Sequence, residues 1–419
     1  MNKTVSLIVP THNRCYSLIR LLDMFENQTY PLNMLEVIIV ADGCIDKTVA
    51  LLKEHNTSYS LRYIEQDGHG AATARNSGAQ SANGEILIFL DDDIEPCNDL
   101  IMAHVQAHIN ENTVVIGYLP MDMPKKATLL QISLANYWEQ KYSLMADPNY
   151  RYGYSDLLSG NFSVSAELFK KVNHFDSEFR CREDYELGAR LITAGAEFVF
   201  SKNAWGLHRD ESNTLERSFQ RKRDEGKADV LFASKHPALF PLLTLSAYSN
   251  KTGLGRKLLF GSAFNKAPVT DRIALSMTAV LRFLERHKQR SYYQRLNGKL
   301  QKYWYLRGIS DAVKTKKNWD DFIQQFKPSL EPLPIIMQLD LKEGLPHAVK
   351  QLDDFRPESV SIHFGNHFIG EIFARPGYER LKGKHLHRIL LHEFPHTLVQ
   401  ALMIERVIND QIFYGYNGN

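Results

Sequence analysis

The feature that most constrains this 419-residue chain is a short apolar run that ends in three consecutive carboxylates. Residues 86–90 read Ile-Leu-Ile-Phe-Leu, which is typical of a strand buried in a parallel sheet. Asp91, Asp92 and Asp93 follow directly, and their like charges disfavour a buried strand end unless a cation compensates them. Because residues two apart share a face of an extended chain, Asp91 and Asp93 can reach one hard divalent ion. A solvated acidic turn explains the same three residues, so the surrounding chain has to decide between the two interpretations.

Segments with strand and helix patterns alternate on the N-terminal side of this run. Alternation at this spacing predicts βαβ units and a parallel sheet flanked by helices. Right-handed crossovers place the end of every strand at the same edge of the sheet, which is where open α/β sheets bind ligands. The expected strands are residues 5–10, 37–40 and 61–64, and the expected helices are residues 16–26, 46–54 and 71–82.

Composition excludes several classes of protein. Lys and Arg number 50 against 48 Asp and Glu, so the net charge of +2 does not favour a nucleic-acid partner. Four scattered cysteines without a C-x-x-C pair argue against a zinc knuckle or a disulfide framework, and indicate a reducing compartment. No apolar run approaches the roughly 20 residues of a spanning helix, and no signal peptide precedes the first strand. We therefore expect a cytoplasmic protein, either free or peripheral on the inner face of a membrane.

Two motifs suggest other chemistry but lack its context. A dinucleotide-binding loop would need a third glycine after the Gly-His-Gly of residues 68–70, and Thr73 occupies that place. Residues 392–396 satisfy the H-E-x-x-H pattern of zinc proteases, which requires both histidines on one helical face. Pro395 fits better as the first residue of a following helix, which would leave His392 outside that helix.

Several ordered stretches of residues 3–235 resemble family 2 glycosyltransferases. They are Val-Ser-Leu-Ile-Val-Pro-Thr-His-Asn-Arg at 5–14, Ala-Asp-Gly-Cys-Ile-Asp at 41–46, Gly-Ala-Ala-Thr-Ala-Arg-Asn-Ser-Gly at 70–78, the acidic strand at 84–93, Leu-Ser-Gly-Asn at 158–161, Phe-Asp at 175–176 and Arg-Glu-Asp-Tyr-Glu-Leu-Gly at 182–188. The resemblance implies an α/β GT-A fold, in which helices flank a Rossmann-like, mostly parallel sheet. It also implies metal-dependent, inverting transfer of a sugar from a nucleotide-diphosphate sugar, with a UDP-sugar as the expected donor.

The resemblance further implies which residues bind the donor. Asp42 would accept a hydrogen bond from a uracil-type imide, although many relatives have two acids where this chain has Ala41-Asp42. Arg75 would reach the nucleotide and its phosphates, because a planar, permanently charged guanidinium suits a diphosphate. An ordinary turn at Asp42 and a surface arginine at position 75 are the alternatives. The other expected donor-binding residues are Pro10, Thr11, Asn13 and Arg14 at the base, together with Asp91, Asp92, Gly160 and Asn161.

A second set of residues would carry the metal and the proton transfer. By resemblance, Asp93 contacts Mn²⁺ or Mg²⁺ directly, Asp91 contacts the ribose or a metal-bound water, and His208 approaches the metal or the diphosphate. A structural role is the alternative for His208. The pair Glu183-Asp184 matches the family's acidic pair, in which Asp184 would be the general base that deprotonates the acceptor hydroxyl. Two acids at a helix N-terminus also stabilise the helix dipole without any catalysis.

The remaining third of the chain lacks these patterns. We predict three parts, a GT-A catalytic domain at 1–235, a basic helical extension at 236–325 and a small α/β module of unknown role at 326–419. Residues 273–286 predict a helix, and residues 333–337, 360–364 and 368–373 predict strands of the module.

Residues 282–317 interleave basic side chains with Tyr292, Tyr293 and the Tyr-Trp-Tyr run of 303–305. This pattern suits contact with an anionic membrane or acceptor, and a helical pair packed on the catalytic domain is the alternative. Together with the resemblance, it suggests an unidentified glycan or lipid-linked acceptor, in the assembly of a cell-surface polysaccharide or glycolipid. A non-catalytic nucleotide-sugar-binding or scaffold protein is the competing hypothesis.

Overall fold

The computed structural model describes residues 3–209, 214–249, 254–265, 267–326 and 335–405. The chain divides into two compact units. The large unit comprises Met1–Ser143 and Tyr154–Lys327, and the small unit comprises Leu144–Gly153 and Pro328–Asn419. The basic helical segment therefore belongs to the same compact unit as the predicted catalytic sheet.

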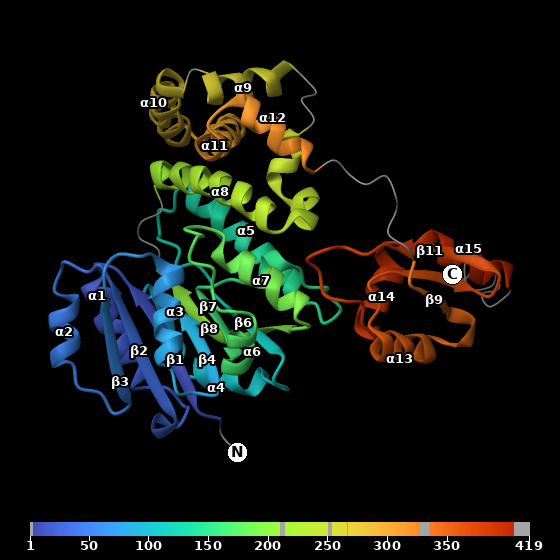
Figure 1. Cartoon of the computed structure of the whole chain (residues 1–419), viewed down its shortest axis with the longest axis horizontal. Helices are drawn as coiled ribbons and strands as arrows, with labels where there is room; N and C mark the ends of the chain where they lie inside the picture. Colours follow the sequence, from blue (N-terminus) through green and yellow to red (C-terminus); the bar gives the residue numbers. More distant parts are fainter. Residues whose placement is uncertain (1–2, 210–213, 250–253, 266, 327–334, 406–419) are drawn as a thin grey trace, which may run out of the picture. The chain divides into compact units, whose positions relative to one another are not determined.

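An eight-stranded sheet with the order β3-β2-β1-β4-β7-β6-β8-β5 forms the centre of the large unit (Figure 1). The block β3-β2-β1-β4 is parallel throughout, as the βαβ pattern predicts. Strand β7 runs antiparallel to both of its neighbours, β4 and β6, and β5 runs antiparallel to β8. The strands are β1 (Val5–Thr11), β2 (Leu35–Asp42), β3 (Ser60–Gln66), β4 (Ile86–Leu90), β5 (Ile94–Pro96), β6 (Thr113–Tyr118), β7 (Asn161–Ser165) and β8 (Glu197–His208).

The acidic strand lies in the middle of this sheet. All five residues of β4 are buried, and its Phe89 stacks on Phe162 of β7 with ring centroids 4.8 Å apart. The α/β fold class predicted from the sequence is thus confirmed, and β4 has the predicted bounds. Helices of this layer are α1 (Cys15–Phe25), α2 (Thr48–Glu54), α3 (Ala71–Ser81), α4 (Leu100–Ala107), α5 (Leu129–Met145), α6 (Ala166–Lys171) and α7 (Glu183–Thr193).

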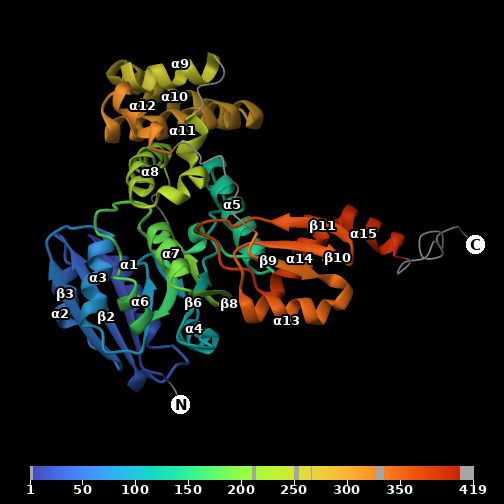
Figure 2. The same ribbon diagram turned by 45° about the vertical axis from the view of Figure 1, so that its right-hand side comes forward.

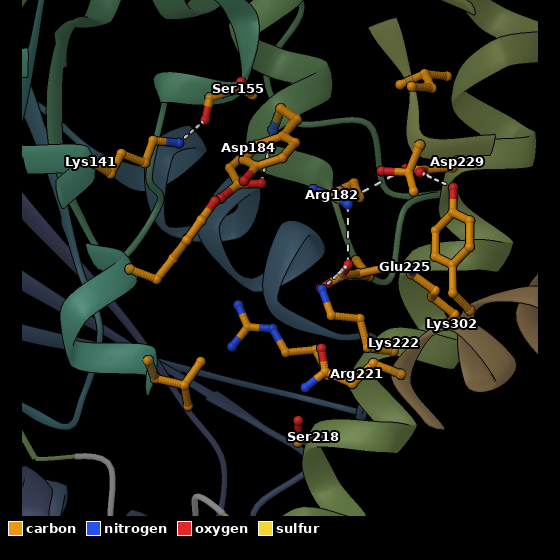
Figure 3. Close-up of a pocket in the computed structure, with 18 of the residues that line it drawn as sticks. Lys141, Ser155, Arg182, Asp184, Ser218, Arg221, Lys222, Glu225, Asp229 and Lys302 are labelled. Carbon is orange, nitrogen blue, oxygen red and sulfur yellow. Dashed lines mark hydrogen bonds and ion pairs between the residues drawn. The ribbon is translucent and has the colours of Figure 1, made fainter. Parts of the chain in front are cut away.

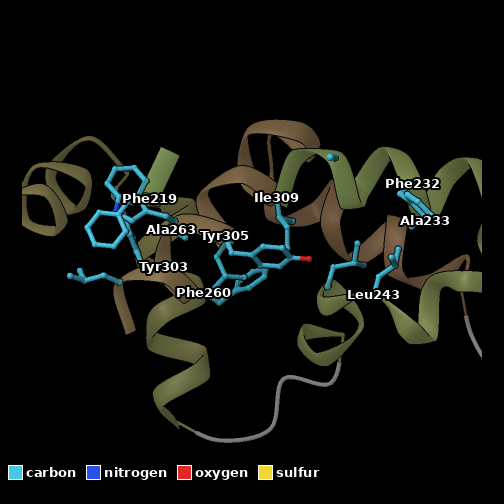
Figure 4. Packing of buried hydrophobic residues seen from close by; sticks show 14 of the residues in the cluster. Phe219, Phe232, Ala233, Leu243, Phe260, Ala263, Tyr303, Tyr305 and Ile309 are labelled. Carbon is cyan, nitrogen blue, oxygen red and sulfur yellow. The ribbon is translucent and has the colours of Figure 1, made fainter. Parts of the chain in front are cut away.

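A bundle of helices completes the large unit: α8 (Leu215–Lys235), α9 (Leu254–Asn265), α10 (Ala267–Arg286), α11 (Arg290–Val313) and α12 (Lys316–Gln324). Figure 4 shows how apolar side chains of α8, α9 and α11 form a shared core. Helices α8 and α11 approach closely, because a Cβ at Gly226 would collide with the carbonyl oxygen of Tyr305 and one at Gly308 with that of Arg223. This backbone contact fixes α11 against α8.

The Tyr-Trp-Tyr run packs inside the helical bundle, which agrees with the alternative of a packed helical pair and not with an exposed interface. Tyr303, Trp304 and Tyr305 are all at least 95% buried in the bundle core. Arg307 is also buried, and its Nε lies 3.0 Å from Oδ1 of Asp271 on α10. Sequence alone did not separate an interfacial aromatic belt from a packed helix, because both require aromatic side chains beside basic ones. No described helix combines the length and apolar character needed to cross a bilayer.

The small unit has a three-stranded sheet of order β11-β10-β9, covered by helices (Figure 2). Residues 144–153 belong to this unit, since Asp147 forms an ion pair with Arg388 and Arg151 Nε donates to the carbonyl of Glu379 at 2.6 Å. The elements are β9 (Met337–Asp340), α13 (Leu345–Phe355), β10 (Val360–Phe364), β11 (His367–Ile372), α14 (Gly383–His392) and α15 (Pro395–Ile404). The strand predicted at 333–337 begins outside the described residues, and the observed strand starts at Met337.

Helix boundaries explain the H-E-x-x-H sequence of the small unit. His392 is the last residue of α14, whereas Pro395 and His396 open α15. The two histidines thus lie on different helices, as the position of the proline predicts.

Candidate active site

The carboxyl ends of neighbouring parallel strands bring the predicted polar residues together. Thr11 ends β1, Asp42 ends β2 and Asp91 follows β4, and these three strands are adjacent in the sheet. Residues separated by as many as 80 positions in the chain therefore meet at one edge, where open α/β sheets bind ligands.

Arg14 compensates two of the three consecutive acids. Its Nη1 lies 2.5 Å from Oδ2 of Asp93 and 3.2 Å from Oδ1 of Asp92. The hydroxyl of Thr11 donates to Oδ2 of Asp92 at 2.7 Å. Burial raises the pKa of Asp92 to about 7 despite these contacts. Burial acts in the same direction on Asp93, but His208 and Arg14 outweigh it and lower the pKa of Asp93 to about 2.

Arg75 links the strand end to the acidic pair on α7. Its side chain is only 4% exposed, with Nη2 at 2.8 Å from Oδ1 of Asp91 and Nη1 at 3.1 Å from Oε1 of Glu183. The guanidinium predicted to reach the donor phosphates is thus held between two carboxylates. Its position joins the two sets of predicted site residues into one charged network.

Asp93 and His208 offer the best fit to a divalent ion. Asp93 Oδ1 is buried without a hydrogen-bond partner in the described chain, and it lies 3.5 Å from Nε2 of His208. The pairing of Ile94 with His208 in the β5–β8 ladder brings these side chains together. Across the described residues, no three His, Cys, Asp or Glu side chains cluster as a complete metal site. The Asp93 carboxylate suits an ion such as Mg²⁺, which commonly uses one or two carboxylates plus substrate phosphates.

Asp42 has a different set of contacts from the expected one. Oδ1 accepts hydrogen bonds from Gln66 Nε2 and His69 N, both at 2.8 Å, and Oδ2 accepts from Gly70 N at 2.7 Å. The carboxylate is 7% exposed and thereby holds the loop that starts α3. This geometry favours the structural role at a helix start over direct recognition of a base.

Asn161 is the clearest departure from the expected donor contacts. Its side chain is fully buried, with Oδ1 at 2.8 Å from Nε2 of His104 and Nδ2 donating to the carbonyl of Ala204 at 2.9 Å. The structure speaks against a direct donor contact by this residue. Gly160 remains at the site, because its carbonyl accepts a hydrogen bond from Asp91 N at 3.1 Å.

The loop after β1 is tied to the loop after β2. Asn13 has a left-handed backbone with φ of 54°, and its Oδ1 accepts from Ile45 N at 2.8 Å and from Asp46 N at 3.2 Å. Pro10 is half-buried just before this loop. The predicted base-binding segment is therefore held in place by side-chain contacts before any ligand binds.

Asp184 lies in the first turn of α7, next to Glu183. Burial raises the pKa of Asp184 to about 6, and the negative charge of Glu183 adds to the shift. The backbone N–H of Tyr185 donates to its Oδ1 at 2.8 Å. A carboxyl group with a pKa near neutrality suits proton abstraction at physiological pH.

Asp184 also lines a cavity of about 820 Å³ in the large unit, with walls that include residues of α5, α7, α8 and α11 (Figure 3). Arg182 lines this cavity and forms ion pairs with two acids of α8, with Nη2 at 3.2 Å from Glu225 Oε2 and Nε at 3.3 Å from Asp229 Oδ1. The hydroxyl of Tyr305 donates to Asp229 at 2.5 Å. The Tyr305 ring thus has an internal role that the sequence pattern did not reveal.

Sequence reasoning found only part of this cavity. Asp184 is the cavity residue that the family motif predicted, and Arg221 and Lys222 of α8 also line the cavity. Arg223 instead forms an ion pair with Asp311 at 2.5 Å. Lys141 and Lys302 come from other helices, and no local spacing could have connected them with Asp184.

Residues 6–172 match the family model described as glycosyl transferase family 2, and residues 140–212 match one described as the N-terminal domain of galactosyltransferase. Validoxylamine A glucosyltransferase from Streptomyces hygroscopicus subsp. jinggangensis is 26% identical over 273 residues, which are 57% of this chain and 62% of that protein. Chondroitin synthase from Pasteurella multocida is 24% identical over 271 residues, 55% of this chain and 27% of the synthase.

The chain spans about 60% of the length of the first two curated relatives. Among solved structures, the mannosyltransferase PcManGT from Pyrobaculum calidifontis, in complex with GDP-Man and Mn²⁺, aligns with a TM-score of 0.46 and 17% identity. The alignment covers 75% of this chain and 89% of the mannosyltransferase.

Proposed function

Because this chain belongs to glycosyl transferase family 2 through residues 6–172, we propose that it transfers a sugar from a nucleotide-diphosphate sugar to an acceptor hydroxyl with inversion. One observation carries the proposal. Arg75 joins Asp91, at the ligand-binding edge of the sheet, to Glu183, the neighbour of a buried carboxyl that lines a cavity. The charged network around Arg75 would thus connect a donor at the strand ends with an acceptor in the cavity.

The donor diphosphate would lie at the ends of β1 and β4. A divalent ion held by Asp93 and His208 would neutralise charge on the departing diphosphate when bound. Arg14 would then be shared between the acids and the donor, since its guanidinium already lies at Asp92 and Asp93. The carboxylate of Asp93 and the phosphate oxygens of the donor are ligand types that suit both Mn²⁺ and Mg²⁺, whereas imidazole is more typical of Zn²⁺ and later transition metals.

Asp184 would act as the general base. It would remove the proton from the acceptor hydroxyl while that oxygen bonds to the anomeric carbon from the face opposite the diphosphate. The bond between the anomeric carbon and the phosphate oxygen breaks in the same displacement, and its electron pair leaves with the diphosphate. One displacement from the opposite face inverts the configuration.

The donor experiment uses the full chain. Purified protein is incubated with Mn²⁺ and separate UDP-, GDP- and dTDP-sugars, and release of the nucleoside diphosphate by slow hydrolysis is followed. We expect release from UDP-sugars above all, although the engagement of Asp42 by its own loop leaves base recognition to other residues. Binding of a nucleotide sugar without any turnover, even with added glycan acceptors, would favour the non-catalytic binding or scaffold protein.

Contact with a membrane is the second part of the proposal, and α10 supports it better than the aromatic run does. Val269, Ile273, Val280 and Phe283 are exposed and follow one another at helical spacing, so they form one apolar stripe. Tyr292 on α11 is likewise exposed. Such a stripe beside basic side chains is typical of a helix that lies in a membrane interface.

The cations beside this stripe select an anionic surface as the partner. Arg272 and Arg286 are exposed on α10 without ion-pair partners among the described residues, Lys288 lies in the turn that follows, and Arg290 is the first residue of α11. Each Lys or Arg near an anionic bilayer contributes about 1 kcal/mol. A cytoplasmic enzyme of polysaccharide or glycolipid assembly could in this way meet a lipid-linked acceptor.

Co-sedimentation with vesicles containing anionic phospholipid tests this surface. Phe283→Asp and Arg272→Glu/Arg286→Glu should each reduce binding at low salt, whereas Lys299→Glu, on the exposed side of α11, serves as a control for charge reversal elsewhere. Equal sedimentation of all variants, or none of the wild type, would refute the α10 surface.

A further inference from the structure

The cavity beside Asp184 carries more positive charge than its own acids can neutralise. Its lining includes six cationic and three acidic side chains, so a surplus of three positive charges remains. The acids are Asp184, Glu225 and Asp229, and the cations are Lys141, Arg182, Arg217, Arg221, Lys222 and Lys302.

Three of these cations already have acidic partners. Lys141 Nζ lies 3.6 Å from Asp156 Oδ1, and Lys222 Nζ lies 2.7 Å from Glu225 Oε2. Arg182 is held by Glu225 and by Asp229. These cations form part of the cavity wall, and their charges are largely neutralised by these acidic partners.

The other three cations have no acidic partner within ion-pair distance among the described residues. Arg217, Arg221 and Lys302 form no hydrogen bond or ion pair through their side chains with any described residue, and all three are exposed. Arg217 and Arg221 are four residues apart on α8, so they lie on one face of that helix. Lys302 lines the cavity from α11, and Figure 3 shows it together with Arg221, Ser218 and Lys222.

We propose that this cavity binds an acceptor that carries a phosphate group, with Arg217, Arg221 and Lys302 as its phosphate-binding side chains. The inference rests on the proposed function, because it takes the cavity beside Asp184 as the acceptor side of the site. Two guanidinium groups on one face can donate paired hydrogen bonds to phosphate oxygens, and an ammonium adds a point charge. Mutually repelling cations at a cavity are stabilised by such a ligand.

Two further features agree with this assignment. Arg217, Arg221 and Lys302 lie beyond the two family matches, which end at residues 172 and 212. Tyr137 and Trp138 of α5 also line the cavity, and aromatic rings can pack against the apolar faces of a glycan. A glycan with a phosphate substituent would use both kinds of surface.

The test is a binding comparison that needs no turnover. Glucose 1-phosphate and methyl glucoside, which differ chiefly in charge, are titrated by calorimetry into the full chain saturated with UDP and Mn²⁺. Occupying the donor site in advance directs the anionic probe to the cavity. We expect the phosphorylated probe to bind at least tenfold more tightly, a difference of about 1.4 kcal/mol.

Two double variants separate the cavity from general surface charge. Arg217→Gln/Arg221→Gln should remove the preference for the phosphorylated probe, whereas Arg295→Gln/Lys299→Gln, which removes two exposed cations of α11 outside the cavity, should retain it. Arg217→Lys/Arg221→Lys keeps the charge and should give an intermediate preference. Equal binding of both probes by the wild type, or an unchanged preference in the cavity variant, would overturn the proposal.

A third probe distinguishes the source of the phosphate. The phosphodiester of glucose 1-phosphate with an octyl chain stands for a lipid-linked acceptor, and glucose 1-phosphate for a soluble phosphorylated glycan. Tighter binding of the octyl compound assigns the lipid-linked class, and equal or weaker binding assigns the soluble class. Binding is measured without transfer, so the two proposals are tested independently. A negative turnover assay would count against the proposed function, whereas the phosphate preference is decided by the binding comparison alone.

Discussion

Replacing Arg75 by methionine should destabilise the large unit far more than replacing an exposed arginine. The guanidinium of Arg75 is the shared partner of Asp91 and Glu183, with distances of 2.8 and 3.1 Å. Methionine retains much of the apolar stem and packing volume, so the change removes chiefly the charge and its hydrogen bonds. Both carboxylates would then lose their common cation.

The magnitude follows from burial. The Arg75 side chain is 4% exposed and that of Glu183 is 15% exposed, and breaking a pair of this kind costs about 3–5 kcal/mol. Because Asp91 is 36% exposed, solvent screens its interaction with Arg75. We therefore expect a loss of about 3 kcal/mol, the lower end of this range. The matched control is Arg62→Met, because Arg62 is 44% exposed and its pair with Glu36 is worth at most about 1 kcal/mol.

The assay is urea denaturation followed by tryptophan fluorescence. All four tryptophans of the chain belong to the large unit, so their emission reports the unfolding of that unit alone. Arg75→Met/Glu183→Gln should recover at least about 1 kcal/mol of the loss, since it removes one uncompensated charge.

A loss in Arg75→Met no larger than that in Arg62→Met would refute the bridging role.

Three other predictions concern the base, the metal and the contact between α8 and α11. Asp184→Asn should abolish transfer and leave UDP affinity within about twofold. The wild-type transfer rate should fall about tenfold per pH unit below pH 6, because the protonated carboxyl of Asp184 cannot accept the proton of the acceptor hydroxyl. A transfer rate that is flat from pH 5 to 7 contradicts the assignment of Asp184 as the base. EDTA and Asp93→Asn should each weaken UDP binding at least tenfold in calorimetry, and equal affinity with and without EDTA would remove the metal from the proposal. Gly308→Ala should lower the free energy of unfolding by about 1–3 kcal/mol, because it forces α11 away from α8. The control is Gly298→Ala on the same helix, where a Cβ meets nothing within 4 Å, and it should be neutral or stabilising. Similar unfolding midpoints for the two variants would contradict the close helix contact.

The parallel half of the sheet and its ligand-binding edge could be predicted because both depend on local patterns. Residues 86–90 form an apolar run of the length of a strand, and β4 has those bounds. The order of strand, helix and strand then places Thr11, Asp42 and Asp91 at one edge by handedness alone. The need for a cation beside the three acids was likewise evident, and Arg14 and Arg75 meet it.

Contacts between distant segments could not be predicted in the same way. Asn161 belongs to a motif expected to bind the donor, yet the antiparallel pairing of β7 with β4 and β6 turns its amide into the core. Tyr305 and Arg307 have the composition of a membrane-facing segment, but the close approach of α8 buries both. In each case the outcome depends on which element packs against the residue, and the residue spacing within one segment does not reveal that element.

The link from Arg75 to Asp91 and Glu183 is of this second kind, and it has a consequence for the proposed mechanism. Arg75 is on α3, Asp91 follows β4 and Glu183 begins α7, so three separate elements meet at one guanidinium. The positive charge of Arg75 also lowers the pKa of Asp184, opposing the larger effects of burial and Glu183. Any ligand that draws Asp91 away from Arg75 would leave more of that positive charge to Glu183 and Asp184. A donor bound at the strand ends would therefore favour the ionised, proton-accepting form of Asp184, on the side of the site where the acceptor hydroxyl is expected.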